Sequence, residues 1–339
     1  MEAVERNSFD NAYKVSKSLV TALSRIIRGR TDTIELVVAA LIADGHVLLE
    51  DYPGSGKTTL AKTLGGLIDS TPHSALSNTS TEKEPIIGFR RIQFTPDMLP
   101  GDVLGVNIFD PKTGQFNFLH GPVFAHIVLA DEINRTGPKV QSAFLECMAE
   151  KQVTIDNITH QLDDLFFVLG TQNPLDLAGT YPLPQVQLDR FLFRVPMSYV
   201  DAQTELAILE DIKVIENASS QVTPICSREQ ILAARAACAE VHVATSLQKA
   251  IVDTVQATRN NPMIQFGAST RAALMLQKAT RAWAILNSRD YATPDDLRHV
   301  APFVLLHRLK FHAGAGEAPA ALEELMRPAM ERAVAVGVG

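Results

Sequence analysis

The sequence is poor in cysteine and has no long apolar run. Its 339 residues include three cysteines, at positions 147, 226 and 238. None stands in a CxxC or CxH spacing, so we expect neither a disulfide framework nor a zinc cluster. The most apolar stretch, residues 36–49, is interrupted at 44–46 by Asp-Gly-His and is shorter than the ~20 helical residues that cross a bilayer. With no apolar segment of the signal-peptide type near the N-terminus, these absences predict a cytoplasmic protein without membrane insertion.

Basic residues are fewer than acidic ones. The chain has 31 Lys and Arg against 38 Asp and Glu, a formal net charge of −7, and this balance disfavours a protein that coats nucleic acid through many phosphate contacts. The apolar share of 46% and the charged share of 20% are typical of globular proteins and exclude a disordered chain. At about 100–200 residues per domain, the length predicts two domains.

The apolar pattern changes along the chain. Helical spacing predicts helices at 9–27, 31–43, 58–68 and 138–151, and short apolar runs predict buried strands at 46–50, 127–130, 166–169 and 191–195. Strands that alternate with helices favour a parallel sheet covered on both faces. After about residue 200 only helix signals remain, among them a helix from Asp201 to about Asn217 and capped starts at 227–230, at Ser269 and at 293–296.

We therefore predict an α/β domain over residues 1–200 and an all-helical domain over residues 201–339. Two connecting segments have patterns of their own. Residues 153–162 alternate around Asp156-Asn157, which predicts a β-hairpin. Residues 69–85 are rich in Ser, Thr and Pro, a composition typical of an exposed loop.

The segment from Asp51 to Thr58 carries the strongest functional signal. It matches the phosphate-binding motif G-x-x-x-x-G-K-[ST] at every fixed position except the first, where aspartate replaces glycine. In such a loop, backbone N–H groups face the phosphates, the lysine contacts the β- and γ-phosphates, and the hydroxyl binds Mg²⁺. The expected nucleotide-binding residues are Asp51, Tyr52, Pro53, Gly54, Ser55, Gly56, Lys57, Thr58 and Thr59, and Thr58 is also expected to bind Mg²⁺.

Polar residues at the ends of two predicted strands add to this signal. Asp131 and Glu132 follow the strand at 127–130; the aspartate can hold Mg²⁺ and the glutamate can polarise an attacking water. Together with the phosphate loop, they predict hydrolysis of a nucleoside triphosphate and not binding alone. Asn173 follows the next strand and could orient the same water; a turn-forming Asn before Pro174 is the alternative.

Six longer stretches closely resemble the MoxR family of AAA+ ATPases, in the clade with an insert in helix 2. They are residues 91–105, 121–135, 139–153, 170–191, 267–274 and 289–308. The resemblance implies an α/β AAA+ P-loop NTPase core, in which a five-stranded parallel sheet has helices on both faces and β-hairpin inserts, followed by an all-α helical lid domain. The insert would lie at about 91–120, and a hairpin before the sensor 1 residue at about 153–162.

The resemblance also implies residue roles. Lys57 and Thr58 would be the Walker A residues, Asp131 and Glu132 the Walker B residues, and Asn173 sensor 1. Arg190 resembles the arginine finger, which acts on ATP bound by an adjacent subunit, and Arg271 resembles sensor 2, which reaches from the lid to the γ-phosphate. Nothing local in the sequence separates either arginine from a surface arginine. The expected catalytic residues are Glu132, Asn173, Arg190 and Arg271.

The function implied by the resemblance is that of an ATP-driven chaperone. Such proteins use ATP and Mg²⁺, form hexameric rings, and work with a von Willebrand factor A partner to mature or remodel a protein client. Two alternatives are a nucleic-acid-dependent motor and a metal-chelatase-like motor subunit. Residues 153–164 contain three Asp and no Lys or Arg, which disfavours the first alternative; the second would differ little in mechanism.

Four further residues bear on this interpretation. The doublet Arg90-Arg91 is expected to be solvated, and contact with a polyanion is the alternative. Arg135 is a weaker candidate for a place near a subunit interface. Asp51 stands where family members usually have glycine, and its charge could weaken ATP affinity. An ATP-binding scaffold without activity is disfavoured, because every position needed for hydrolysis is filled.

Overall fold

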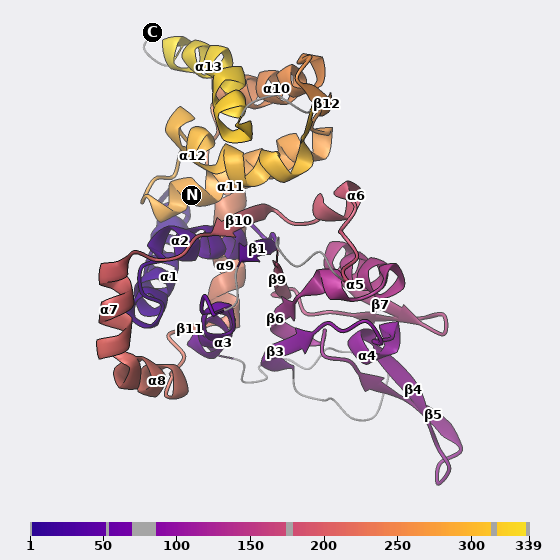
Figure 1. The fold of residues 1–339 in the computed structure, drawn as a ribbon. Coiled ribbons are helices and arrows are strands. Elements are labelled where there is room, and N and C mark those ends of the chain that lie inside the picture. Colours follow the sequence, from indigo (N-terminus) through magenta and orange to yellow (C-terminus); the bar gives the residue numbers. More distant parts are fainter. Residues whose placement is uncertain (1, 52–53, 70–85, 174–178, 313–316, 337–339) are drawn as a thin grey trace.

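The computed structural model describes residues 2–51, 54–69, 86–173, 179–312 and 317–336 (Figure 1). The exposed loop predicted at 69–85 therefore lies outside the described residues except at Asp69. The same is true of Tyr52 and Pro53 in the phosphate loop. Within the described ranges, no helix combines the length and the apolarity that a membrane span requires.

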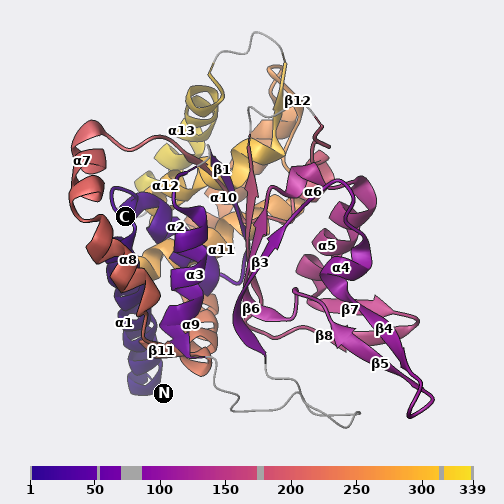
Figure 2. The same ribbon diagram turned by 60° about the horizontal axis from the view of Figure 1, so that its bottom comes forward.

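The central sheet consists of five parallel strands in the order β10-β1-β9-β6-β3. The strands are β1 (Val47–Asp51), β3 (Ile87–Gln93), β6 (Ala125–Asp131), β9 (Phe167–Gln172) and β10 (Phe193–Met197). Every residue of β6 is buried, because helices cover both faces of the sheet. Figure 2 shows α3 (Lys57–Leu67) on one face and α5 (Pro138–Glu150) on the other. The predicted α/β core with a five-stranded parallel sheet is confirmed.

Alternate strand residues supply two apolar cores, one on each face of the sheet. Ile127 and Leu129 of β6 belong to the larger core, which also takes in α1 (Glu2–Ile26), α2 (Thr31–Ile42) and α3. Val128 and Ala130 belong to the smaller core, with Phe144 of α5. Successive side chains of a strand point to opposite faces, so one short apolar run serves both cores.

The sequence prediction missed β3, the edge strand beside β6. Its residues IGFRRIQ are mostly exposed or partly buried, so no continuous apolar run marks the strand. The insert predicted at about 91–120 stays a prediction, and residues 91–93 of this range belong to the central sheet. The chain then forms α4 (Pro100–Leu104) and an antiparallel pair, β4 (Gly105–Asp110) and β5 (Gln115–His120).

The β-hairpin predicted at 153–162 is present. It pairs β7 (Gln152–Ile155) with β8 (Ile158–Gln161), and the turn residues Asp156 and Asn157 both have positive φ, 50° and 66°. Aspartate and asparagine tolerate this conformation better than most residues. The hairpin lies against β4–β5: the Phe118 ring stacks on His160 with centroids 3.9 Å apart, and both hairpins project from the same side of the molecule (Figure 2).

After β10 the chain is almost entirely helical, as predicted. The helices are α7 (Ala202–Glu210), α8 (Ile212–Ser220), α9 (Arg228–Glu240), α10 (Thr245–Asn260), α11 (Thr270–Leu286), α12 (Pro294–Leu305) and α13 (Ala318–Val336). The side chains of Ser227, Ser269 and Thr293 each accept a hydrogen bond from a backbone N–H in the first turn of α9, α11 and α12, which confirms the predicted capped starts.

Two predictions in this part are wrong in detail. The single helix from Asp201 to about Asn217 is two helices, divided at Asp211, whose ψ of 7° departs from the helical value. Short strands also occur where none is predicted: β11 (Cys226–Ser227) pairs with β2 (Ile68–Asp69), and β12 (Ile264–Phe266) pairs with β13 (Lys310–Phe311). Strands of two or three residues are too short to show a period of two.

The helical part shares the larger core with the N-terminal helices. α9 packs along α1, and apolar residues of α10 to α13 join the same cluster. The helical lid that follows the α/β core is confirmed as a structural class, whereas its boundary at residue 200 stays a prediction.

His46, just before β1, joins three segments of the core. It is buried; its Nδ1 accepts from the N–H of Val168 at 3.1 Å, and its Nε2 lies 3.1 Å from the carbonyl oxygen of Met148. These contacts require a neutral ring with the proton on Nε2. Burial lowers the pKa of His46 from its ordinary value of 6.5 to about 4.

We predict that the protein loses stability between pH 6.5 and pH 4 because of His46. The unfolded chain binds a proton near the ordinary pKa, and the folded chain binds it only near the lowered pKa. The free energy of unfolding should therefore fall by about 3 kcal/mol as the pH is lowered through this window.

Urea unfolding at several pH values measures the effect. His46→Gln should flatten the decline relative to wild type, and the exposed His312→Gln should leave it unchanged. A decline of equal size in wild type and His46→Gln would contradict the prediction.

Candidate active site

The phosphate loop connects β1 to α3. Gly54 and Gly56 have φ values of +89° and +90°, a conformation that side-chain-bearing residues rarely adopt. Gly56 precedes Lys57, the first residue of α3, so the first N–H groups of this helix open toward the loop. Such a helix start binds anions through its N–H groups and its dipole.

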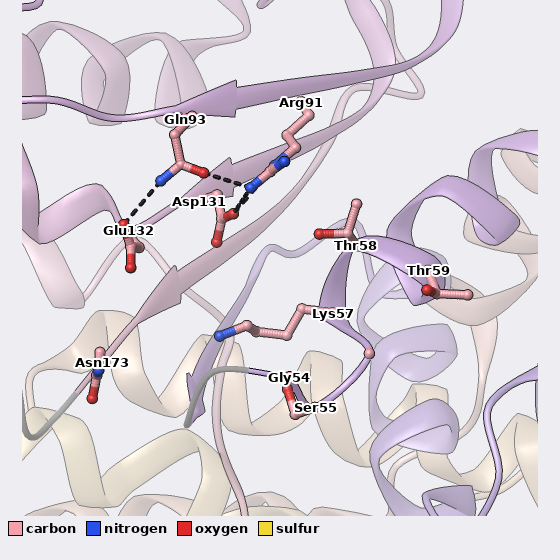
Figure 3. Close-up of a pocket in the computed structure, with 11 residues that line it drawn as sticks. Gly54, Ser55, Lys57, Thr58, Thr59, Arg91, Gln93, Asp131, Glu132 and Asn173 are labelled. Atoms are coloured by element: carbon pink, nitrogen blue, oxygen red, sulfur yellow. Dashed lines mark hydrogen bonds and ion pairs between the residues drawn. The ribbon is translucent and has the colours of Figure 1, made fainter. Parts of the chain in front are cut away.

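A cavity of about 440 Å³ lies beside this loop. It is lined by Gly54, Ser55, Gly56, Lys57, Thr58, Thr59, Arg91, Gln93, Asp131, Glu132 and Asn173. The described residues of three separate sequence motifs therefore meet in one place, together with two residues from β3. In Figure 3 the side chain of Lys57 extends from the start of α3 into the space between the loop and the strand ends.

Asp131 is the last residue of β6 and is buried. Its Oδ1 accepts a hydrogen bond of 2.7 Å from the hydroxyl of Thr171 on the neighbouring β9. The same hydroxyl oxygen accepts from the N–H of Glu132 at 2.9 Å. Thr171 thus holds both acidic residues in place. The sequence prediction missed it, because the predicted strand ends at residue 169 and a threonine just after a strand has no distinguishing signal.

Glu132 has an unusual backbone. Its φ is 55°, in the left-handed region, which is uncommon for a residue with a side chain and is concentrated at functional sites. Its carboxylate accepts a hydrogen bond of 2.9 Å from Gln93 and lies 2.9 Å from the Nε of Arg135. Arg135, a weaker candidate in the sequence, is therefore an ion-pair partner of the proposed catalytic glutamate.

Arg91 is exposed, as predicted, but it also forms an ion pair that the sequence does not predict. Its Nη2 and Nε lie 2.6 Å and 3.2 Å from Oδ2 of Asp131, and its Nη2 also donates to Oε1 of Gln93 at 2.5 Å. The reason is the register of the missed strand: Gln93 lies opposite Asp131, and Arg91, two residues earlier, points to the same side. A correct assignment of β3 from the sequence would have identified both residues.

The two predicted arginines lie outside the cavity lining. Arg190 donates to the carbonyl oxygen of Leu145 at 2.9 Å. Arg271, half exposed, lies 3.8 Å from a carboxylate oxygen of Asp189. Within the described chain, the structure therefore does not bring Arg190 or Arg271 to the phosphate loop.

Asp189 has a second and closer partner. The buried Arg308 approaches its Oδ1 at 2.7 Å and donates to the carbonyl oxygens of Asp189 and Phe191. Burial lowers the pKa of Arg308 to about 10, against the opposing effect of Asp189, so the residue remains charged at neutral pH. This ion pair joins the segment that carries Arg190 to the short 3₁₀ helix Leu306–Arg308, which follows α12.

The cavity fits a nucleotide with Mg²⁺. Apart from the adjacent residues, no described atom lies within 4 Å of the place where a Cβ of Gly54 or Gly56 would be, so the loop backbone is open on this side. Lys57 and Thr58 supply the cation and the hydroxyl that phosphates and the metal require. Asp131 supplies the carboxylate that Mg²⁺ prefers. The structure describes no side chain for Asp51, so the predicted effect of its charge on ATP affinity stays a prediction.

A phosphate loop between a strand and a helix, an acidic pair at the end of a neighbouring strand, and the strand order of this sheet define a P-loop ATPase core of the AAA class. Residues 46–193 match the family described as "ATPase family associated with various cellular activities (AAA)", and residues 256–328 match the AAA lid domain. The family matches of the α/β core and of the helical part therefore agree with the class that the fold and the site define.

Individual relatives refine this class. The chain is 37% identical to chaperone MoxR1 of Mycobacterium tuberculosis over 85% of this chain and 73% of the relative. It is 43% identical to the uncharacterized protein YeaC of Bacillus subtilis over 91% and 92%. A crystal structure of a candidate ATPase from Cytophaga hutchinsonii superposes with a TM-score of 0.82 at 35% identity, covering 98% and 97% of the two chains. The chain belongs to the MoxR family of AAA+ ATPases.

We predict that Thr171→Val destabilises the protein. Thr171 is fully buried, and valine would leave Oδ1 of Asp131 and the N–H of Glu132 without this partner. The expected loss in the free energy of unfolding is about 1–3 kcal/mol.

Chemical denaturation measures the loss. The matched control is Thr154→Val, which removes a hydroxyl–hydroxyl contact on the exposed hairpin and should change the free energy of unfolding by less than about 0.5 kcal/mol. Equal effects of the two substitutions would contradict the prediction.

Proposed function

We propose that this protein hydrolyses ATP with Mg²⁺ and uses the energy, within a hexameric ring, to mature or remodel a protein client. The observation that carries the proposal is the meeting of Lys57, Thr58, Asp131, Glu132 and Asn173 around one cavity. Each supplies a group that phosphoryl transfer to water requires. The name of the M. tuberculosis relative, a chaperone, supports a protein client.

The proposed mechanism assigns each side chain one task. Lys57 and the N–H groups at the start of α3 hold the β- and γ-phosphates. Thr58 and Asp131 would hold Mg²⁺, which when bound neutralises phosphate charge. Glu132 accepts a proton from the attacking water, and Asn173 orients that water. Gln93 and Arg135 both contact Oε2 of Glu132, so the proposal assigns the other oxygen, Oε1, to the attacking water.

Arg190 acts in a neighbouring subunit under this proposal. It does not line the cavity of its own chain, and an arginine finger supplied by another subunit can be worth about 10³–10⁵ in rate. The helical lid that follows the core carries Arg271, which would reach the γ-phosphate under this proposal. To do so, Arg271 must leave Asp189. This ion pair is weak, because its charged atoms are 3.8 Å apart and half of the Arg271 side chain is exposed.

Partner and location are further parts of the proposal. We propose a von Willebrand factor A protein as partner on the basis of the family resemblance. We propose a cytoplasmic location on the basis of the sequence. A nucleic-acid-dependent motor is disfavoured: the hairpin β7–β8, residues 152–161, has no Lys or Arg to contact a phosphate backbone. A metal-chelatase-like motor subunit would use the same catalytic groups.

We predict that Glu132→Gln binds ATP but lowers its turnover at least 100-fold, because the amide cannot accept the proton of the attacking water. Lys57→Ala should instead weaken ATP binding. The control is Lys62→Ala, an exposed lysine one turn further along α3, which should leave both properties unchanged.

Phosphate release and binding of a fluorescent ATP analogue measure the two properties. Turnover by Glu132→Gln equal to that of wild type would contradict the proposed hydrolysis. The same variant, held in ATP, also tests the client: affinity capture should retain a protein, and recovery of nucleic acid without protein would favour the alternative motor.

We predict that two inactive variants restore activity when mixed. Arg190→Ala keeps its own Glu132, and Glu132→Gln keeps its own Arg190. A mixed ring therefore contains sites in which an intact Glu132 meets a neighbour's Arg190. Phosphate release should be low for each variant alone and should rise after mixing and reassembly. Absence of any rise would contradict the action of Arg190 across a subunit boundary.

A further inference from the structure

Arg91 and Asp131 form an ion pair inside the cavity. Two nitrogens of the guanidinium approach the same carboxylate oxygen, Oδ2, at 2.6 Å and 3.2 Å. The other oxygen, Oδ1, accepts from Thr171. Both oxygens of Asp131 therefore already have donors in the structure.

This ion pair conflicts with the expected task of Asp131. Mg²⁺ binds carboxylate oxygens together with waters and phosphates. Because the fully buried Thr171 donates to Oδ1, we take Oδ2, the oxygen that Arg91 contacts, as the one left for the metal. A guanidinium and a divalent cation at the same oxygen repel each other. Contact of Asp131 with Arg91 and binding of Mg²⁺ to that oxygen are therefore mutually exclusive.

The arrangement of Arg91 allows it to leave. Its side chain is 46% exposed, and among the described residues its guanidinium has two hydrogen-bond partners, Asp131 and Gln93. Arg308 shows the contrast: only 3% exposed, it contacts several carbonyl oxygens and could not move without disrupting the core. A guanidinium is also well suited to contact phosphate oxygens in pairs.

We propose that Arg91 occupies the Mg²⁺ position on Asp131 in the nucleotide-free protein and so keeps free divalent cations out of the site. This inference rests on the proposed function, since it takes Asp131 as a metal ligand. The metal enters together with a nucleotide, whose phosphates offer the displaced guanidinium another anion. Asp131 keeps a cation and Arg91 keeps an anion in both states, so no unpaired charge is left in the cavity.

The test uses Mn²⁺ as the probe, titrated into nucleotide-free full-length protein and followed by the loss of its free EPR signal. Arg91→Met should bind Mn²⁺ at least about ten-fold more tightly than wild type, because a neighbouring like charge is removed. Adding Asp131→Asn to Arg91→Met should abolish the gain. Arg91→Lys, which keeps the charge, should stay within about two-fold of wild type.

The matched control is Arg90→Met, which removes the same charge from the same strand. Arg90 is exposed and its side chain alternates to the other face of β3, so Mn²⁺ affinity should not change. Equal Mn²⁺ affinity of wild type and a folded Arg91→Met would overturn the proposal, as would a gain that survives Asp131→Asn. Failure of wild type to bind ATP with Mn²⁺ would instead overturn the proposed function.

Discussion

Two adjacent carboxylates, Asp131 and Glu132, impose the constraint on which the site depends. Asp131 is 8% exposed, and a carboxylate in such a place is costly unless hydrogen bonds and cations accompany it. The strands on either side of β6 meet this requirement: Thr171 comes from β9, and Arg91 and Gln93 come from β3. A shift of β3 by one residue would turn both of its side chains away from the carboxylates.

The positions of these partners follow from the parallel sheet. Parallel strands end at a common edge, where the phosphate loop after β1 also lies, and ligands of open α/β sheets bind at this edge. The same edge holds the unusual backbone of the site: Gly54 and Gly56 in the loop and Glu132 after β6 all have positive φ. The buried runs of the strands stabilise the sheet firmly enough to hold these conformations.

A buried cation connects the sheet to the helical part. Arg308, which follows α12, binds the carboxylate of Asp189 and the carbonyl oxygens of Asp189 and Phe191. Asp189 is also the neighbour of Arg271 on α11. Asp189 therefore lies between the helices of the lid and Arg190. Removal of either partner of a buried ion pair is strongly destabilising. We therefore expect the contact between Arg308 and Asp189 to persist, whereas the exposed contact between Arg271 and Asp189 can break.

Local patterns of residues predicted much of the fold and of the site. The buried strands, the capped helix starts, the hairpin turn at Asp156 and Asn157, and the phosphate loop each depend on a few consecutive residues, whose spacing, caps or conformational tolerance the sequence displays directly. The sequence by itself therefore determined the α/β class, the helical part after it, and the loop and acidic residues that lie in the cavity.

Tertiary structure alone decided how the acidic pair is held and where the arginines lie. β3 covers a sheet edge and needs little apolar surface, so its pattern is weak, and the roles of Arg91 and Gln93 depend on its register with β6. Thr171 is 40 residues from Asp131, and Arg308 is 119 residues from Asp189. Such partners are selected by distance in space and by the cost of burying an unpaired charge, and no local spacing along the chain records either.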